Sequence, residues 1–213
     1  LGESIFFRQP VLRIIGQRAE TSVFLGIMAL IVVVGLGIPA GVIAAVRPNS
    51  WVDNSLLLLA LTGASIPSFW LGLMLMVVFA GKLHLLPSSG YTSVMATGNI
   101  ANLKNLILPA FALGFVNAAL VARTARSSML DVLRADYITT ARAKGLQDSV
   151  VILKHALRNA AIPITTVVSF TFASLVSGAV VTENVFALPG VGSLIVQSVL
   201  KRDYPMIQGI MLV

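Results

Sequence analysis

The sequence contains no cysteine and few charged residues among its 213 positions. Without cysteine the chain can form no disulfide framework, no thiolate zinc site and no cysteine nucleophile. Asp, Glu, Lys and Arg make up 11% of the residues, whereas they make up about 25% of a typical soluble domain. Hydrophobic residues make up 57%, so the charges are too few to cover a water-soluble surface. The composition indicates a membrane protein and excludes a secreted, disordered or water-soluble chain.

The charges that are present are mostly positive. Lys and Arg number 15 against 8 Asp and Glu, which gives a net charge of +7. In so apolar a chain, a basic excess is typical of loops that face anionic membrane lipid or a partner. No basic stretch is interleaved with aromatic residues that could stack on bases, so we expect no nucleic-acid partner. His84 and His155 lie far apart in the sequence and do not suggest a metal site.

Four long runs without Asp, Glu, Lys, Arg or His locate the expected membrane spans. An α-helix of about 20 residues crosses the hydrocarbon core of a bilayer. We therefore expect an all-α membrane protein, a polytopic helical bundle with four complete spans and part of a fifth that begins at Tyr204. Because the sequence begins at Leu1 without a signal peptide, and stops within an apolar run, we expect a chain trimmed at both ends. The four runs are residues 21–46, 54–81, 105–122 and 159–182.

Small and helix-breaking residues punctuate these spans. Gly37 and Gly41 lie four residues apart in the first run, Pro67 lies in the second, and Pro163 opens the fourth. Small residues let helix backbones approach closely, and proline frees a carbonyl group and bends a helix. Two interpretations remain open, which are ordinary tight packing and hinges of a moving pore.

The distribution of positive charge indicates which loops face the cytoplasm. Alternating spans place residues 47–53 and 123–158 on one side of the membrane and the remaining loops on the other. The first side carries 8 Lys and Arg in 43 loop residues, and the second carries 7 in 66. Positive charge concentrates in cytoplasmic loops, so this bias favours a cytoplasmic position for residues 123–158.

The loop at residues 123–158 begins with a helical pattern. Leu130, Leu133, Tyr137 and Ala141 recur at spacings of three and four. Residues at these spacings lie on one face of an α-helix. The pattern predicts one amphipathic helix with these four side chains on its apolar face.

A second helical stretch in the same loop is predicted after a glycine. Gly145 follows Lys144, which is typical of a helix end with a cation in the last turn and a residue that accepts positive φ. Asp148 then stands as the expected N-cap before the apolar residues 150–153. The predicted helical hairpin is cationic on one side and apolar on the other. It fits either an amphipathic element at the lipid surface or a docking helix for a soluble partner.

Short motifs in and after this loop carry a resemblance to a known family. Residues 140–145 read Thr-Ala-Arg-Ala-Lys-Gly, residues 154–159 read Lys-His-Ala-Leu-Arg-Asn, and Ile162-Pro163 follow. These stretches resemble the cytoplasmic EAA loop of binding-protein-dependent ABC importer permeases, in the form found in the dipeptide/oligopeptide/nickel permease family. The positions that read Glu-Ala-Ala in the general pattern of this loop read Thr139-Thr140-Ala141 here. The peptide-permease form of the loop accommodates this departure.

Further ordered matches extend the resemblance over almost the whole chain. They include Ser-Ile-Pro-Ser-Phe-Trp at 65–70, Pro189-Gly190, and Arg-Asp-Tyr-Pro at 202–205. The resemblance implies the transmembrane domain of a type I ABC importer, which has six spans in this family. It implies a single permease domain at residues 1–213, with residues 123–158 as its cytoplasmic EAA or coupling loop.

The resemblance also implies a site at which the permease docks onto an ATPase. The coupling helix of this family sits in a groove of the ATP-hydrolysing subunit. A short rigid helix suits this role because it transmits motion that a floppy loop would absorb. The expected docking residues are Tyr137, Thr140, Ala141, Arg142, Ala143, Lys144, Gly145 and Leu146.

The expected function is transport without covalent chemistry, so no catalytic residue is assigned. The chain contains no GxxxxGK[ST] loop and cannot bind ATP in that way, so it should bind no cofactor itself. ATP and Mg²⁺ would belong to two separate ATP-binding subunits. By the resemblance, we expect a second permease subunit that forms a heterodimer, an extracytoplasmic solute-binding protein, and a location in a bacterial or archaeal cell membrane.

The expected substrates are dipeptides or oligopeptides, with nickel chelates and glutathione as alternatives within the same family. A different class, the intramembrane hydrolases, requires paired catalytic residues within the spans. Neither histidine and no aspartate lies inside one of the four runs, which argues against that class.

Two polar residues are candidates for the translocation path. Asn117 is the most polar residue well inside the third run, and Glu183 follows the fourth run directly. Asn117 could instead form an interhelical hydrogen bond. Glu183 could be solvated at the membrane interface, or it could bind the terminal ammonium group of a peptide.

Overall fold

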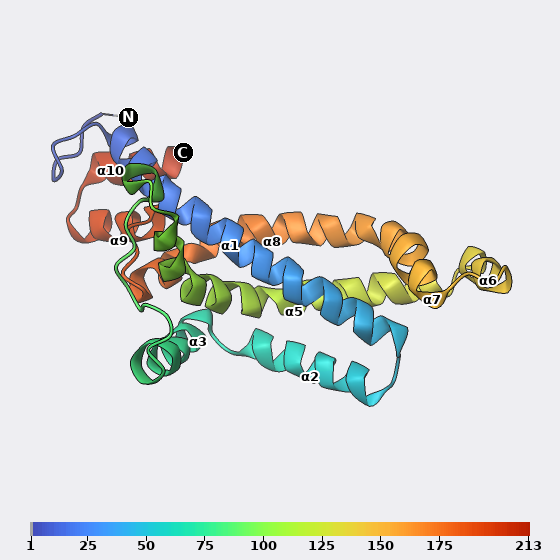
Figure 1. The fold of residues 1–213 in the computed structure, drawn as a ribbon. Helices are drawn as coiled ribbons and strands as arrows, with labels where there is room; N and C mark the ends of the chain where they lie inside the picture. The colour runs from blue at the N-terminus through green and yellow to red at the C-terminus, as the bar shows by residue number, and fades with distance from the viewer. Residues whose placement is uncertain (1) are drawn as a thin grey trace. The chain divides into compact units, whose positions relative to one another are not determined.

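The computed structural model describes residues 2–213, apart from the side chain of Ala96, so residue 1 of the expected domain lies outside the described part. Within that part the chain is helical, with no strand beyond an isolated bridge between Glu3 and Pro10. This architecture confirms the all-α prediction (Figure 1). The elements are α1 (Val11–Val46), α2 (Trp51–Ser65), α3 (Ser68–Leu75), η1 (Met76–Lys82), α4 (Val94–Thr97), η2 (Ile100–Leu106), α5 (Ile107–Leu133), α6 (Asp136–Ala143), α7 (Asp148–Val150), η3 (Val151–Ala156), α8 (Leu157–Val185), α9 (Val191–Leu200) and α10 (Tyr204–Leu212).

Three continuous helical segments are long and apolar enough to cross a membrane. They are Val11–Val46, Ile100–Leu133 and Asp148–Val185, and they contain the first, third and fourth predicted spans. Each helix extends beyond its charge-free run, because charged residues at a helix end can reach the interface. The predicted spans are therefore confirmed at these three places.

The second predicted span is a bent pair of helices rather than one straight helix. Trp51–Ser65 and Ser68–Lys82 are separate helical segments with Ile66 and Pro67 between them. Pro67 lies at the break, and Ile66 before it has an extended backbone with φ −85° and ψ 125°. Proline disfavours the α conformation in the residue before it and donates no backbone hydrogen bond. The expectation of four uninterrupted spans is corrected here to three, or to four if the bent pair counts as one.

The chain divides into two compact units. Unit 1 comprises residues 2–29, 68–113 and 174–213 of the described chain, and unit 2 comprises residues 30–67 and 114–173. The hairpin predicted around Gly145 belongs to unit 2.

Two carboxylates, those of Asp203 and Glu20, hold the irregular segments of unit 1 by accepting hydrogen bonds from them. The Asp203 carboxylate caps α10 and accepts hydrogen bonds from the Ser4 hydroxyl and from the backbone N–H groups of Ile5 and Phe6. Burial raises the pKa of Asp203, but these hydrogen bonds outweigh burial and leave the pKa below its usual value. Glu20 on α1 similarly accepts hydrogen bonds from Tyr91 and Ser93, which precede α4, and from the N–H of Met95 in α4.

Unit 2 is held together by close contact between α1 and α5. A Cβ atom added to Gly37 would lie 2.9 Å from the carbonyl oxygen of Ala118, and one added to Gly41 would lie 2.6 Å from the Cβ of Ala125. Both distances are too short for real contacts, so the two backbones meet only because these positions have no side chain. This geometry confirms tight packing as a role of the glycine pair.

We expect Gly41→Ala to lower the stability of the protein by about 1–3 kcal/mol, because the added methyl group overpacks the contact with α5. Gly35→Ala is the matched control, since nothing lies within 4 Å of the added Cβ there. Thermal unfolding in detergent should show a lower midpoint for Gly41→Ala alone. Equal midpoints for the two variants would contradict close packing at Gly41.

Candidate coupling site

The predicted hairpin exists, and its turn has the geometry expected of a helix end. Helix α6 stops at Ala143, and Gly145 follows with φ +79°. The N–H of Gly145 donates to the carbonyl of Arg142 at 2.9 Å, and the N–H of Leu146 donates to the carbonyl of Ala141 at 3.4 Å. This pair of hydrogen bonds is a Schellman motif, which glycine favours because it adopts positive φ without steric cost. The prediction that Gly145 ends a helix is confirmed.

The first half of the hairpin differs from the prediction of one continuous helix. Leu130 and Leu133 lie at the end of α5, and Tyr137 lies in the separate helix α6. Ala135 between them is extended, with φ −74° and ψ 145°. This extended residue breaks the helical periodicity between α5 and α6, so α6 presents a different face to the core. The side chain buried in α6 is that of Ile138. Tyr137 is 43% exposed, and its predicted place on the apolar face is wrong.

Asp148 does not have the N-cap role that the sequence predicts. Helix α7 begins at Asp148 itself, and Gln147 is its N-cap without a side-chain hydrogen bond. The Asp148 carboxylate instead lies 3.4 Å from the Nε atom of Arg142 on α6. Both side chains are largely exposed, and exposed ion pairs are weak. Arg142 can therefore leave this ion pair at little cost.

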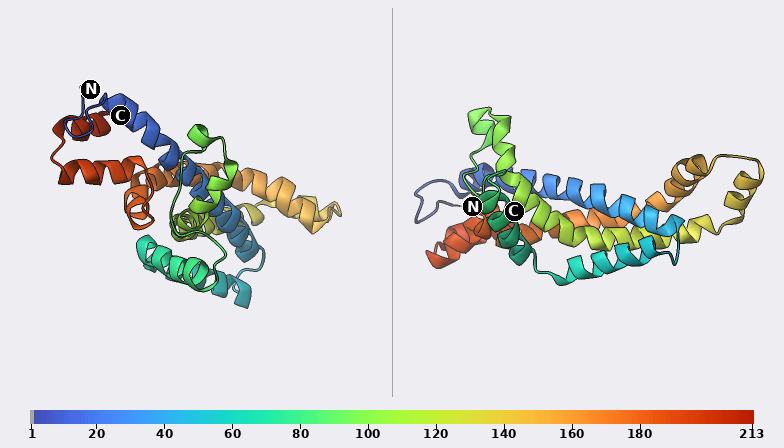
Figure 2. Two further views of the ribbon diagram at one scale, coloured as in Figure 1. Left: turned by 60° about the vertical axis from the view of Figure 1, so that its left-hand side comes forward. Right: turned by 60° about the horizontal axis from the view of Figure 1, so that its bottom comes forward.

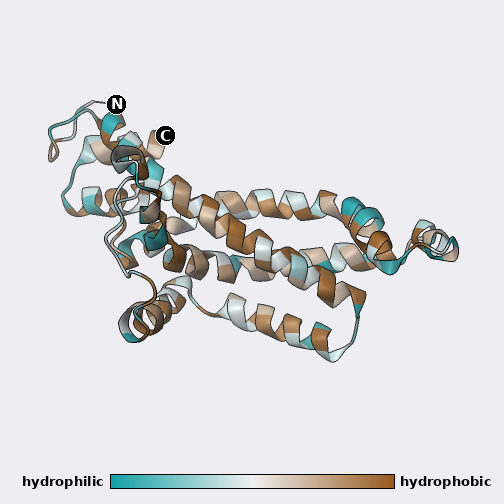
Figure 3. Ribbon diagram, viewed as in Figure 1, coloured by the Kyte–Doolittle hydropathy of each residue, from teal (hydrophilic) through white to brown (hydrophobic). Residues whose placement is uncertain are grey.

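The predicted docking residues gather at the exposed end of the hairpin. Figures 1 and 2 show α6 and α7 projecting beyond the neighbouring ends of α5 and η3. All of the eight residues are exposed except Ala141, which packs against a buried cluster. Figure 3 shows hydrophilic residues around α7 and on the first turns of α8, whereas the remainder of α8 and most of α5 are apolar. The site therefore offers two cations, Arg142 and Lys144, beside the apolar side chains of Tyr137 and Leu146.

A buried cluster fixes the hairpin to the helices of unit 2. Ile138 of α6 is fully buried in it, and Ala141, Leu130 and Leu133 pack against its surface. The Asn159 amide adds a hydrogen bond of 2.8 Å to the Tyr137 hydroxyl oxygen. The hairpin is consequently held as a rigid projection. The buried members of the cluster are Ala45, Ala125, Met129, Ile138, Val151, Ala156, Ala160 and Ile164.

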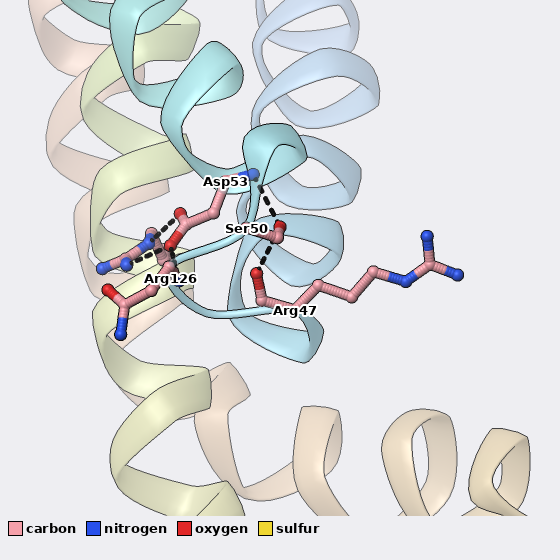
Figure 4. A network of polar contacts seen from close by, with 5 residues as sticks. Arg47, Ser50, Asp53 and Arg126 are labelled. Carbon is pink, nitrogen blue, oxygen red and sulfur yellow. Dashed lines mark hydrogen bonds and ion pairs between the residues drawn. The ribbon is translucent and has the colours of Figure 1, made fainter.

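A polar network at the start of α2 is the feature that sequence analysis missed. Asp53 is fully buried and forms two hydrogen bonds with Arg126 of α5, from Nε at 2.5 Å and from Nη2 at 2.6 Å (Figure 4). Ser50 caps α2 by accepting a hydrogen bond from the N–H of Asp53. The spacing Ser50-x-x-Asp53 is a sequence signal for a helix start, but it carries no information about Arg126.

The two candidates for the translocation path belong to different units. Asn117 lies on α5 in unit 2 and is half-buried. Glu183 lies in unit 1 and is fully buried, so the interpretation that it is solvated at the interface is wrong. After α8, Gly190 and the first residues of α9 pack against the carboxylate. Glu183 accepts hydrogen bonds from the Ser22 hydroxyl at 2.6 Å and from the N–H of Ser193 at 2.8 Å.

Comparison with known proteins decides the family. Residues 37–213 match the family described as the inner membrane component of binding-protein-dependent transport systems. The chain belongs to this family. The predicted resemblance is confirmed, and the chain is a transport permease of the ABC importer class.

Several named permeases are similar to the chain over at least 98% of its length. A Brucella abortus (strain 2308) protein, named for a peptide transport system permease, is 42% identical over 212 residues, which cover 100% of this chain and 67% of the relative. The dipeptide transport system permease protein DppB of Alkalihalophilus pseudofirmus is 40% identical over 232 residues, covering 100% of this chain and 70% of the relative. DppB of Escherichia coli K12 is 40% identical over 231 residues, covering 98% and 68%.

Proposed function

We propose that this chain is the permease subunit of an ATP-driven importer of dipeptides or oligopeptides. It would form half of the translocation path, opening alternately to each side of the membrane. The observation that carries this proposal is the similarity, at 40–42% identity, to permeases named for peptide and dipeptide transport. Nickel chelates and glutathione remain the alternatives against which the substrate is tested.

The exposed end of the hairpin is the proposed docking site for an ATP-binding subunit. Arg142 and Lys144 can pair with carboxylates, and Leu146 can fill a shallow apolar groove. Small side chains at Ala141 and Ala143 allow the partner backbone to come close. The positive-inside bias of residues 123–158 supports a cytoplasmic position for this site.

The assembly that follows from this proposal contains several other chains. Two ATP-binding subunits would bind ATP and Mg²⁺, because this chain has no phosphate-binding loop of the GxxxxGK[ST] type. A second permease subunit would complete the path, and an extracytoplasmic solute-binding protein would deliver the peptide. ATP binding would favour one state of the path by its higher affinity for that state, and hydrolysis would release it.

The proposal is tested by purification and by transport. The tagged chain, extracted from its native membrane, should bring down an ATP-binding subunit and a second permease. Proteoliposomes that contain this complex and its solute-binding protein should accumulate labelled dipeptide only with ATP. Copurification without an ATPase would contradict the importer function. Uptake of nickel or glutathione without peptide uptake would contradict the proposed substrate.

Glu183 provides a test of a path residue. If the carboxylate leaves its hydrogen bonds with Ser22 and Ser193 during transport and binds the terminal ammonium group of the peptide, Glu183→Gln should reduce uptake roughly tenfold, because a charge-assisted hydrogen bond is lost. Asn184→Ala, at the neighbouring exposed position, is the control and should keep normal uptake. Uptake per assembled complex is the measurement. Normal uptake by Glu183→Gln would leave the carboxylate with a purely structural role, as the cap of the first turn of α9.

A further inference from the structure

The ion pair between Asp53 and Arg126 has the geometry of a fixed joint. Both nitrogen–oxygen distances are short, at 2.5 and 2.6 Å, and the two hydrogen bonds run side by side. The Asp53 side chain is 1% exposed and that of Arg126 is 21% exposed. A planar guanidinium group that donates twice to one carboxylate fixes orientation as well as distance. This joint therefore fixes the start of α2 against α5 within unit 2.

The same carboxylate also holds the turn between α1 and α2. It accepts a hydrogen bond of 2.9 Å from the N–H of Asn49, a residue held at φ +60°. The Ser50 hydroxyl donates to the carbonyl of Arg47 at 2.6 Å, which closes the turn (Figure 4). The whole turn is thus fixed to Asp53, and through it to Arg126.

Arg126 occupies the place on α5 where the hairpin is attached. Its neighbour Ala125 belongs to the buried cluster that holds Ile138, and so does Met129 one turn later. A Cβ atom added to Gly41 of α1 would also lie 2.9 Å from the backbone nitrogen of Arg126. Three helices of unit 2 therefore converge on Arg126, two turns before α5 ends at Leu133 and the chain continues into α6.

Stability alone does not account for a charged pair at this place. Taking two charges out of water has a large cost, and well-packed apolar residues of similar volume often serve stability equally well or better. The charged pair adds a directional connection between α5 and the start of α2. Apolar packing alone carries no such direction and would resist movement of one helix along the other less well.

We propose that Asp53 and Arg126 are positioning residues that carry displacement of the hairpin to α2. This inference rests on the proposed function, in which an ATPase moves the hairpin. With the joint intact, α2 follows the end of α5 as the ATPase acts. With the joint broken, the ATPase continues to hydrolyse ATP, but α2 follows poorly and less peptide is transported for each ATP.

The test uses the complete importer in proteoliposomes, with peptide transported per ATP hydrolysed as the measurement. Asp53→Asn and Arg126→Lys should each lower this ratio roughly tenfold, within the range seen for mutations that alter coupling between sites. Arg126→Lys retains the charge and loses the double hydrogen bond. The exchanged double variant, Asp53→Arg with Arg126→Asp, should recover a large part of the ratio. Arg123→Lys is the control, because Arg123 is exposed and lies one turn earlier on the same helix.

The outcomes separate this inference from the proposed function. If the unaltered complex transports peptide and both single variants keep its ratio, the positioning role is overturned while the importer function stands. If a single variant lowers transport and ATP hydrolysis in equal proportion to a loss of assembled complex, the pair is merely structural and the inference is also overturned. If the complex with Asp53→Asn fails to assemble, the peptide transported per ATP by the Arg126→Lys complex alone decides whether the pair has a positioning role. Absence of ATP-driven peptide transport by the unaltered complex would overturn the proposed function itself.

Discussion

Gly145→Leu is expected to abolish coupled transport while leaving insertion into the membrane intact. Gly145 has φ +79°, and a side chain in this conformation costs about 1–2 kcal/mol. The Schellman hydrogen bonds to the carbonyls of Arg142 and Ala141 depend on this conformation. Leucine would open the turn and displace Lys144 and Leu146, which belong to the proposed docking surface. The membrane spans lie elsewhere in the chain, so the amount of inserted protein should stay normal.

Gly98→Leu is the matched control for this prediction. Gly98 also has positive φ, at +66°, and like Gly145 it has nothing within 4 Å of an added Cβ. The two variants therefore carry similar backbone strain, but only Gly145 lies in the hairpin. Uptake of labelled dipeptide and ATP hydrolysis should be measured for both in proteoliposomes. Normal uptake by Gly145→Leu, or equal losses in the two variants, would contradict the coupling role of the turn.

Ile138→Ala is expected to release α6 from its support and to produce the largest loss of stability in the hairpin. Ile138 is fully buried, and truncation of a buried isoleucine to alanine typically costs about 2–5 kcal/mol. The loss falls on α6, which is a helix of 8 residues and too short to be stable without packing. Limited proteolysis should cut the hairpin of the variant much faster, and transport per ATP should fall.

Thr139→Ala is the control for Ile138→Ala, because Thr139 is the next residue of α6 and is exposed. It should show the proteolysis rate and the transport of the unaltered protein. If Ile138→Ala is cleaved no faster than this control, the buried cluster does not hold the hairpin. If cleavage accelerates but coupling stays normal, rigidity of the hairpin is not required for transport.

Local chemistry explains which features could be predicted from the sequence. Charge-free runs locate the spans because placing a charge in hydrocarbon is costly whatever the tertiary structure of the rest of the chain. Gly145 could be assigned as a helix end because positive φ is a property of that one residue and its neighbours. Pro67 could be recognised as a potential helix break because proline donates no backbone hydrogen bond and disfavours the α conformation in the residue before it.

Long-range contacts explain what could not be predicted. Asp53 and Arg126 are 73 positions apart, and neither residue carries a local signal for the other. The burial of Ile138 in place of Tyr137 follows from a single extended residue, Ala135, which shifts the register between two helices. In the sequence Glu183 resembles an exposed residue at a helix end. It is buried because the first turn of α9, which follows later in the chain, covers its carboxylate.

The central claim, that the end of the hairpin touches an ATP-binding subunit, is tested most directly by cross-linking. The chain has no cysteine of its own, so Leu146→Cys places a single reactive group at the exposed end. Met95→Cys, at an exposed position in unit 1, is the control. A photoactivated cross-linker attached to the assembled complex should join position 146, and not position 95, to the ATP-binding subunit. Cross-linking of position 146 to the solute-binding protein, or to no ATPase, would contradict the account.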